Sequence, residues 1–290
     1  MSQSTVKLKK RYKQVNRSLM GNVTTLLFLA FLGVFMVLPL VFVISNAFKP
    51  LDELFIFPPR FFVRNPTLSN FSDMLIVMSE SWVPFSRYLF NTIFITVLGT
   101  FGHVFLSSMA AFALARHHFP GARVIFRIIV LSLMFTPAVT AIPTYIIMAK
   151  INLLDTYWAI ILPAMQTSLG LYLMKQFMET LPEAVLESAR MDGAGEIRIF
   201  WKIGMPMVKP AWITLIILMI QNLWNTISSF TYSEQLKTMP QAMSQILSGG
   251  IARTGVASAV ALIMLSVPLL VFVLSQSKVI ETMSTSGMKD

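Results

Sequence analysis

The sequence predicts an all-α membrane protein with six transmembrane helices, and three observations support this class. Hydrophobic residues make up 55% of the 290-residue chain, charged residues make up 12%, and the mean hydropathy is +0.69. Soluble domains average about 25% charged residues, so this composition argues against a soluble fold. Six apolar runs also reach the roughly 20 helical residues that cross about 30 Å of hydrocarbon. The chain has no cysteine, which excludes a disulfide framework, a thiolate metal site and a cysteine nucleophile.

The first apolar run is expected to be a transmembrane helix at residues 23–46, after a basic N-terminal segment at residues 1–22. It is too long for a cleavable signal peptide, so we expect a retained anchor. A loop over 47–87 separates this helix from a five-helix core over 88–277, and a C-terminal tail over 278–290 follows. The five core spans are expected at 88–115, 128–149, 157–175, 211–232 and 254–277.

The basic residues set the orientation of these spans. Sixteen of the 23 Lys and Arg residues lie in the segments that share a side of the membrane with the N-terminus, and seven lie in the segments on the other side. Because Lys and Arg are enriched in cytoplasmic loops, both termini and the loop over 178–210 are predicted to be cytoplasmic, and the loop over 47–87 external. The net charge of +10 fits lipid headgroup contact and not nucleic acid binding, since the basic residues flank apolar runs.

The spans carry no obvious means of driving transport by themselves. None of the six runs contains Asp, Glu, Lys or Arg away from its ends. Ion-coupled carriers usually need such groups within the membrane, so their absence indicates an outside energy source. The chain also lacks the G-x-x-x-x-G-K-[ST] phosphate loop, so it is not expected to hydrolyse ATP itself.

The most informative motif lies in the charged loop between the fourth and fifth spans. It reads Glu187-Ser188-Ala189-Arg190-Met191-Asp192-Gly193-Ala194 and continues with Phe200, Pro206 and Pro210. A helix is expected to begin at Pro182, because proline suits the first helical position, and to end at Gly193, which permits a left-handed backbone. A second helix is expected from Glu196. It would carry four apolar residues on one side, Ile197, Phe200, Trp201 and Ile203, before the two prolines turn the chain into the next span.

This spacing resembles the EAA loop of ATP-binding-cassette (ABC) importer permeases, in the form found in carbohydrate importers, with Ser188 where that family usually has alanine. The resemblance implies the type I ABC importer permease fold and a coupling helix that docks on an ATPase. It assigns ATPase coupling to nine residues: Glu187, Ser188, Ala189, Asp192, Gly193, Ala194, Phe200, Pro206 and Pro210. It also implies a bacterial inner-membrane location, a second homologous permease subunit, an ABC ATPase dimer that uses ATP and Mg, an extracellular or periplasmic solute-binding protein, and a carbohydrate substrate.

Three alternatives stay open at this point. Without the motif, the amphipathic loop helix fits a position on lipid headgroups equally well. The core of the EAA loop is shared by importers of polyamines, amino acids and glycerol-phosphate esters, so the solute class is a separate question. A non-transport membrane enzyme or an ion-coupled carrier is the remaining class.

The fifth span contains the candidate solute-pathway residues. Gln221, Asn225, Ser228 and Ser229 are expected to share one helical face, close to Trp224, because residues three and four apart are neighbours on a helix. Amides beside an aromatic ring suit the hydroxyls and C–H faces of a sugar. Hydrogen bonding between helices explains the same residues equally well.

The other features favour structural roles. Ser69 is expected to cap a short amphipathic helix in the external loop, which either docks the binding protein or covers the bundle. His103 is expected to be neutral and hydrogen-bonded to a neighbouring helix. Thr136, Thr140 and Thr144 accompany two prolines that are expected to kink the third span. The 20 methionines are spread through the spans, so packing explains them better than a metal site.

Overall fold

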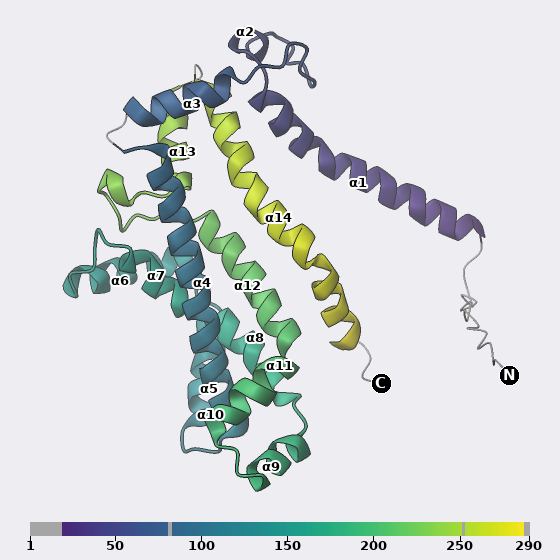
Figure 1. The fold of residues 1–290 in the computed structure, drawn as a ribbon, viewed down its shortest axis with the longest axis vertical. Coiled ribbons are helices and arrows are strands. Elements are labelled where there is room, and N and C mark those ends of the chain that lie inside the picture. The colour runs from purple at the N-terminus through teal and green to yellow at the C-terminus, as the bar shows by residue number, and fades with distance from the viewer. Residues whose placement is uncertain (1–18, 81–82, 251–252, 287–290) are drawn as a thin grey trace, which may run out of the picture.

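The computed structural model describes residues 19–80, 83–250 and 253–286. All the regular elements in these residues are helices (Figure 1), which confirms the all-helical class. The first elements are α1 (Leu19–Ala47), α2 (Leu51–Leu54), α3 (Ser69–Glu80) and α4 (Phe85–Arg116). The next are α5 (Ala122–Ser132), α6 (Pro137–Lys150), α7 (Trp158–Met165), α8 (Ser168–Glu179) and α9 (Glu183–Met191). The chain continues with α10 (Glu196–Ile199), η1 (Phe200–Gly204), α11 (Met205–Met207), α12 (Lys209–Trp224), η2 (Glu234–Leu236), α13 (Met239–Ser248) and α14 (Thr254–Ser286).

The structure supports fewer spans than the six that the sequence predicts. Among the described residues, three helices are long and apolar enough to cross a membrane, at Met20–Ala47, Phe85–Arg116 and Thr254–Gln276. Two bent pairs of helices raise this number to five if each pair forms one span. One pair is α5 with α6, bent by 113°, and the other joins Glu196–Met207 to α12, bent by 78°. The six-span count is therefore not confirmed.

The predicted spans at 128–149 and 157–175 are both interrupted. Helix α5 ends at Ser132, and α6 begins at Pro137 after Thr136, whose backbone is extended at φ −74° and ψ 152°. Proline disfavours a helical conformation in the residue before it, which accounts for this break. The second run divides into α7 and α8 at Gln166 and Thr167, where Thr167 is also extended. Apolar composition alone does not reveal such breaks.

Helix α4 runs through the whole body (Figure 1), between an end near α3, called the α3 end, and an end near α9, called the α9 end. Two apolar cores lie along it. The core at the α9 end is built around Phe112, Met178 and Leu215, and the core at the α3 end is built around Tyr88, Met239 and Val260. Helix α14 runs in the same direction as α4, and α12 runs in the opposite direction.

Helix α1 projects from the body and touches it mainly at its α2 end (Figure 1). The most apolar stretch of α1 has no buried residue. An apolar helix of 29 residues without a covering partner needs lipid or another protein around it. The described part of this chain therefore leaves the apolar surface of α1 uncovered.

The segment after α1 is folded by buried polar contacts. Lys49 donates hydrogen bonds to the side chain of Asn46 and to the backbone oxygen of Arg60. Glu53 accepts hydrogen bonds from the backbone N–H groups of Arg64 and Asn65. The predicted short helix is present as α3, with Ser69 as its first residue. Its Met74 is buried, and Leu75 is exposed.

Candidate functional site

Helix α9 and the turn after it have the local structure that the motif predicts. The helix begins directly after Pro182 and ends at Met191, Asp192 is its C-cap, and Gly193 has a φ of +80°. The N–H of Gly193 donates to the oxygen of Arg190, and the N–H of Ala194 donates to the oxygen of Ala189, both at 3.0 Å. These two bonds form a Schellman motif, which needs a left-handed residue at the position of Gly193. The prediction that Gly193 ends the helix is confirmed.

The motif residues divide into an exposed set and a packed set. Glu187, Ser188, Asp192 and Gly193 are exposed, together with Met191, which keeps 89% of its surface accessible. Ala189 and Ala194 are half-buried and pack on the core at the α9 end. Helix α9 lies at the extreme end of the molecule (Figure 1), where Glu187 and Ser188 are exposed.

Glu196 connects the turn to α4. Its carboxylate accepts a hydrogen bond from Arg190 at 2.9 Å and lies 3.6 Å from Nε2 of His117, the residue that follows α4. The hydrogen bond from Arg190 lowers the pKa of Glu196, partial burial opposes it, and the charges of Arg190 and His117 add to the lowering. Arg190 therefore pairs with Glu196 across the turn and not with Glu187, which lies three residues earlier on the same helix.

Phe200 and the prolines anchor the other end of the loop. Phe200 is buried, and its ring lies 5.4 Å from the ring of Phe112 in α4 at an angle of 62°. The ring of Phe112 also lies against Gly204, and its nearest atom is 3.5 Å from the position that a Cβ on Gly204 would take. Pro206 lies in α11, and Pro210 occupies the first turn of α12, where the chain bends.

The predicted second helix differs in form and in its buried face. The chain forms a short α-helix from Glu196 and then a π-helix over Phe200–Gly204. Ile197 of the predicted apolar side is 77% exposed, whereas Ile199, which the prediction omitted, is fully buried. A π-helix has more residues per turn than an α-helix and so places side chains at smaller angular steps, which means that one α-helical face does not continue from Glu196 through Gly204. The predicted side is therefore wrong in part.

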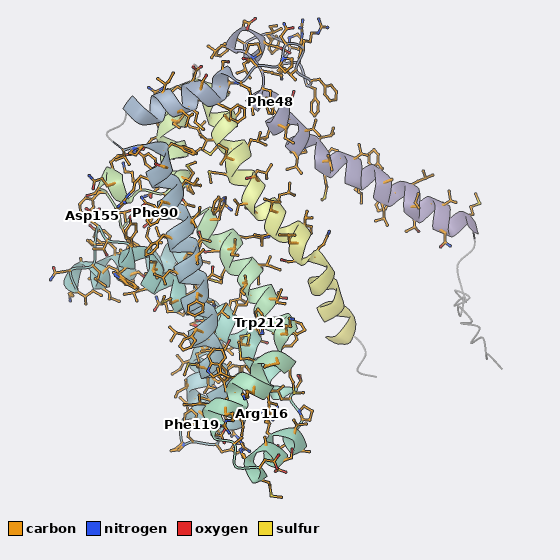
Figure 2. All side chains as sticks on the ribbon, viewed as in Figure 1. Phe48, Phe90, Arg116, Phe119, Asp155 and Trp212 are labelled. Atoms are coloured by element: carbon orange, nitrogen blue, oxygen red, sulfur yellow. The ribbon has the colours of Figure 1, made fainter. Side chains whose placement is uncertain are left out.

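Arg116 fixes the start of the loop to α4. Its guanidinium donates to the backbone oxygens of Met178, in the last turn of α8, and of Leu181, just beyond that helix. Figure 2 shows Arg116 in the half of the molecule that contains α10 and α9. Three residues at one end of α4, Phe112, Arg116 and His117, therefore hold the 178–210 loop.

The candidate pathway residues of the fifth span do not share one helical face, and that prediction is wrong. Helix α12 ends at Trp224, so Asn225, Ser228 and Ser229 lie beyond it. Gln221, Asn225 and Ser229 are exposed. Ser228 is buried, where its backbone oxygen accepts a hydrogen bond from Gln241 and its hydroxyl accepts one from the N–H of Phe230.

Trp224 links α12 to α14. Its buried indole N–H donates to the backbone oxygen of Met264 at 2.8 Å. Pro268, four residues further along α14, has no N–H to donate to this oxygen. The indole therefore supplies the partner that the proline removes, which favours the structural explanation for Trp224. The ring also lines an apolar groove of about 610 Å³ between α4, α12 and α14.

The α3 end of α4 carries a second set of polar contacts. Asn91 is fully buried, and its amide donates to the backbone oxygens of Gln235 and Lys237 and accepts from the hydroxyl of Tyr157. Asp155 accepts hydrogen bonds from the N–H groups of Tyr232 and Ser233. Figure 2 shows Asp155 in the half of the molecule that contains Phe90 of α4.

Helix α13 lies in the segment between the fifth and sixth apolar runs, for which the sequence predicts no helix. A capping box between Thr238 and Gln241, with Pro240 in the first turn, is the signal that identifies it. His103 is hydrogen-bonded to Met165 of the neighbouring α7, as predicted. The described residues contain no group of three or more His, Asp or Glu side chains placed to hold a metal ion.

Comparisons with known proteins agree on one family. Residues 103–282 match the family described as binding-protein-dependent transport system inner membrane component. Protein LplC of Bacillus subtilis is 34% identical over 70% of this chain and 67% of its own length. The polygalacturonan/rhamnogalacturonan transport system permease protein YtcP of the same organism is 32% identical over 69% of this chain and 67% of its own length.

A solved structure has the same fold. It belongs to a bacterial ABC transporter involved in the import of the acidic polysaccharide alginate. The similarity has a TM-score of 0.78 at 21% identity and covers 91% of this chain and 99% of the other.

Proposed function

Because the chain belongs to the family of binding-protein-dependent transport system inner membrane components, we propose that it is a permease subunit of an ATP-driven importer for oligosaccharides. The chain forms part of the solute pathway and transmits the work of ATP hydrolysis, which a separate subunit carries out. It is not an enzyme. ATP and Mg are bound by that subunit.

The observation that carries this proposal is the 178–210 loop. Its exposed face combines Glu187, Ser188 and Asp192 with a turn that only a left-handed residue closes. The loop is held to α4 by Arg116, by the Phe112–Phe200 contact and through Glu196. Force applied to the exposed face of α9 therefore reaches a helix that runs through the body. This is the arrangement that coupling to an ATPase dimer requires.

The solute class comes from the relatives. YtcP is named for polygalacturonan and rhamnogalacturonan transport, and the protein of the solved structure takes part in alginate import. A related structure contains an alginate pentasaccharide-bound periplasmic protein, which supports a solute-binding protein as a partner at the α3 end. The uncovered surface of α1 supports a second permease subunit and lipid as its remaining neighbours.

The proposed orientation places the α9 end in the cytoplasm. The alternating directions of α4, α12 and α14 put the end of α14 on the same side as the 178–210 loop. The distribution of basic residues assigns that side to the cytoplasm, and with it both termini. The α3 end then faces outward, where a binding protein delivers solute.

Site-directed crosslinking tests the proposal directly, because the natural chain has no cysteine. The variant Ser188→Cys in the assembled complex is expected to crosslink to the ATPase subunit through a short bifunctional thiol reagent. The matched control is Ser72→Cys, an exposed serine in α3. It should not crosslink to the ATPase, and a membrane-impermeant reagent should label it from outside intact cells. Crosslinking of Ser72→Cys to the ATPase, or external labelling of Ser188→Cys, contradicts the proposal.

A further inference from the structure

A small cavity with a mixed polar and apolar lining lies beside the break between α7 and α8. Its volume is about 220 Å³, and α4, α5 and the break line it. The polar side chains of the lining are uncharged, and the apolar ones include Ala110 and Ile129. The four polar residues are Ser107, Gln166, Thr167 and Ser168. This set offers hydrogen bonds without a net charge.

The break adds backbone groups to the same place. Helix α7 ends at Met165 and α8 begins at Ser168, within a run that is otherwise apolar. The first N–H groups of a helix have no partner within it, and the side chain of Thr167 does not cap them here. Within a membrane, non-helical backbone occurs where it is buried in protein or lines a water-filled cavity. The cavity supplies the space for such partners.

His103 lies behind the lining and positions two of its hydroxyl groups. Its Nδ1 lies 3.0 Å from the oxygen of Met165, which only accepts, so Nδ1 carries the proton and Nε2 is the acceptor. The hydroxyls of Thr167 and Ser107 lie 3.2 Å and 3.4 Å from Nε2. Nε2 has one lone pair and satisfies one of these donors, and the sulfur of Met219, 3.9 Å from the Thr167 hydroxyl, is a second acceptor. Each hydroxyl oxygen also has two lone pairs, which can accept hydrogen bonds from a ligand.

Gly170 holds the imidazole in place. A Cβ at Gly170 would lie 1.9 Å from Nε2 of His103, so only glycine leaves room for the ring between α4 and α8. The ring is fully buried and rigidly placed. The donors and acceptors around the cavity are thus held in position before a ligand arrives, which reduces the ordering cost of binding.

We propose that this cavity is a solute-contact site that binds hydroxyl groups of the transported oligosaccharide and holds water when solute is absent. The identity of the solute rests on the proposed function, whereas the hydration of the cavity does not. At about 30 Å³ for each water molecule, the volume corresponds to about seven waters, so the site contacts a small part of a sugar chain. The lining contains no cationic side chain that could pair with a carboxylate group of an acidic sugar.

Thiol labelling of single-cysteine variants tests the hydration of the cavity. Ala110→Cys places a thiol in the lining, and Met109→Cys places one on the outer surface of the same helix. In the purified complex in proteoliposomes, a permanently charged thiosulfonate should label Met109→Cys at least about tenfold more slowly, because a charge is strongly disfavoured in hydrocarbon. The pair Ile129→Cys and Ile128→Cys repeats the comparison on α5. Equal rates within both pairs overturn the proposal.

Sugar protection tests the ligand class. Arabinotriose and trigalacturonate, added separately to the complex without its binding protein, are the probes. Slower labelling of Ala110→Cys with either sugar supports hydroxyl recognition. Labelling that neither sugar slows shows a water-filled break without a solute site and overturns the assignment. Failure of the proposed function would be seen in a separate measurement, in which the unmodified complex imports no oligosaccharide.

A cavity-filling variant supplies the transport readout. Ala110→Leu should reduce uptake several-fold while the ATPase still copurifies, and Met109→Leu should leave uptake unchanged. Unchanged uptake by Ala110→Leu contradicts the proposal.

Discussion

Replacing Gly193 by alanine isolates the backbone requirement of the turn after α9. Gly193 and Gly195 flank Ala194, and a Cβ at either position meets no atom within 4 Å. They differ in backbone conformation, since Gly193 has φ +80° and Gly195 has φ −70°. Both positions therefore have room for a Cβ, and only the position of Gly193 requires a left-handed backbone.

The expected cost follows from this difference. A residue with a Cβ loses roughly 1–2 kcal/mol in the left-handed region, and the lower entropy of the unfolded chain returns part of this loss. A net cost of about 1 kcal/mol lowers the population of the closed turn relative to the open one about fivefold. Gly195→Ala should be near neutral, because a small loss at the helix N-cap offsets the entropy gain.

Uptake per ATP hydrolysed, measured in proteoliposomes with the binding protein, is the assay. Gly193→Ala should lower this ratio, Gly193→Val should lower it further, and Gly195→Ala should match the unmodified chain. All variants should insert in the membrane and copurify with the ATPase. If Gly193→Ala and Gly195→Ala give the same ratio, the turn geometry does not transmit work and the reasoning fails.

Three further predictions follow from contacts in the structure. Trp224→Phe should lower the free energy of unfolding by about 1–2 kcal/mol, because it leaves the Met264 oxygen without a partner. Thermal unfolding in detergent measures this loss, and an unchanged midpoint contradicts the prediction. Gly170→Ala should cost about 1–3 kcal/mol by overpacking against His103, with partial recovery in the double variant that also carries His103→Ser; the absence of recovery refutes the contact. Glu196→Gln should accelerate hydrogen exchange over 187–196 at neutral pH. Since the folded pKa of Glu196 is lowered, its stabilisation is present above the ordinary pKa of a glutamate and is lost as pH falls through the lowered value. The unmodified loop should therefore lose protection, measured relative to the intrinsic exchange rate at each pH, only under acid conditions.

The sequence predicts the loop after α8 well, because its signals are local. Pro182 and Gly193 act through their own backbone restrictions, and both lie where the structure begins and ends α9. The partner of Arg190 is not predictable in the same way. Glu196 approaches it only after the chain has turned at Gly193, so the pairing depends on the turn and not on helical spacing.

The breaks in the apolar runs escape the sequence for a physical reason. Hydropathy reports the transfer of side chains to hydrocarbon, and it does not report whether the backbone continues as one helix. Pro163 in α7 gave only an ambiguous signal, because membrane helices tolerate proline when neighbours satisfy the freed carbonyl. The capping box at Thr238, in contrast, is a local signal that the sequence itself carries.

The unbroken length of α4 has a consequence for how this chain tolerates change. Phe112, Arg116 and His117 hold the loop at one end, and Tyr88 and Asn91 hold the opposite segment. One inserted residue in the middle would turn these two sets of anchors against each other by about 100° and separate them by about 1.5 Å. Seven inserted residues would nearly restore the angle but add about 10.5 Å. Insertions and deletions should therefore be rejected here even at positions whose side chains touch nothing, since what matters is the angular phase between the two ends.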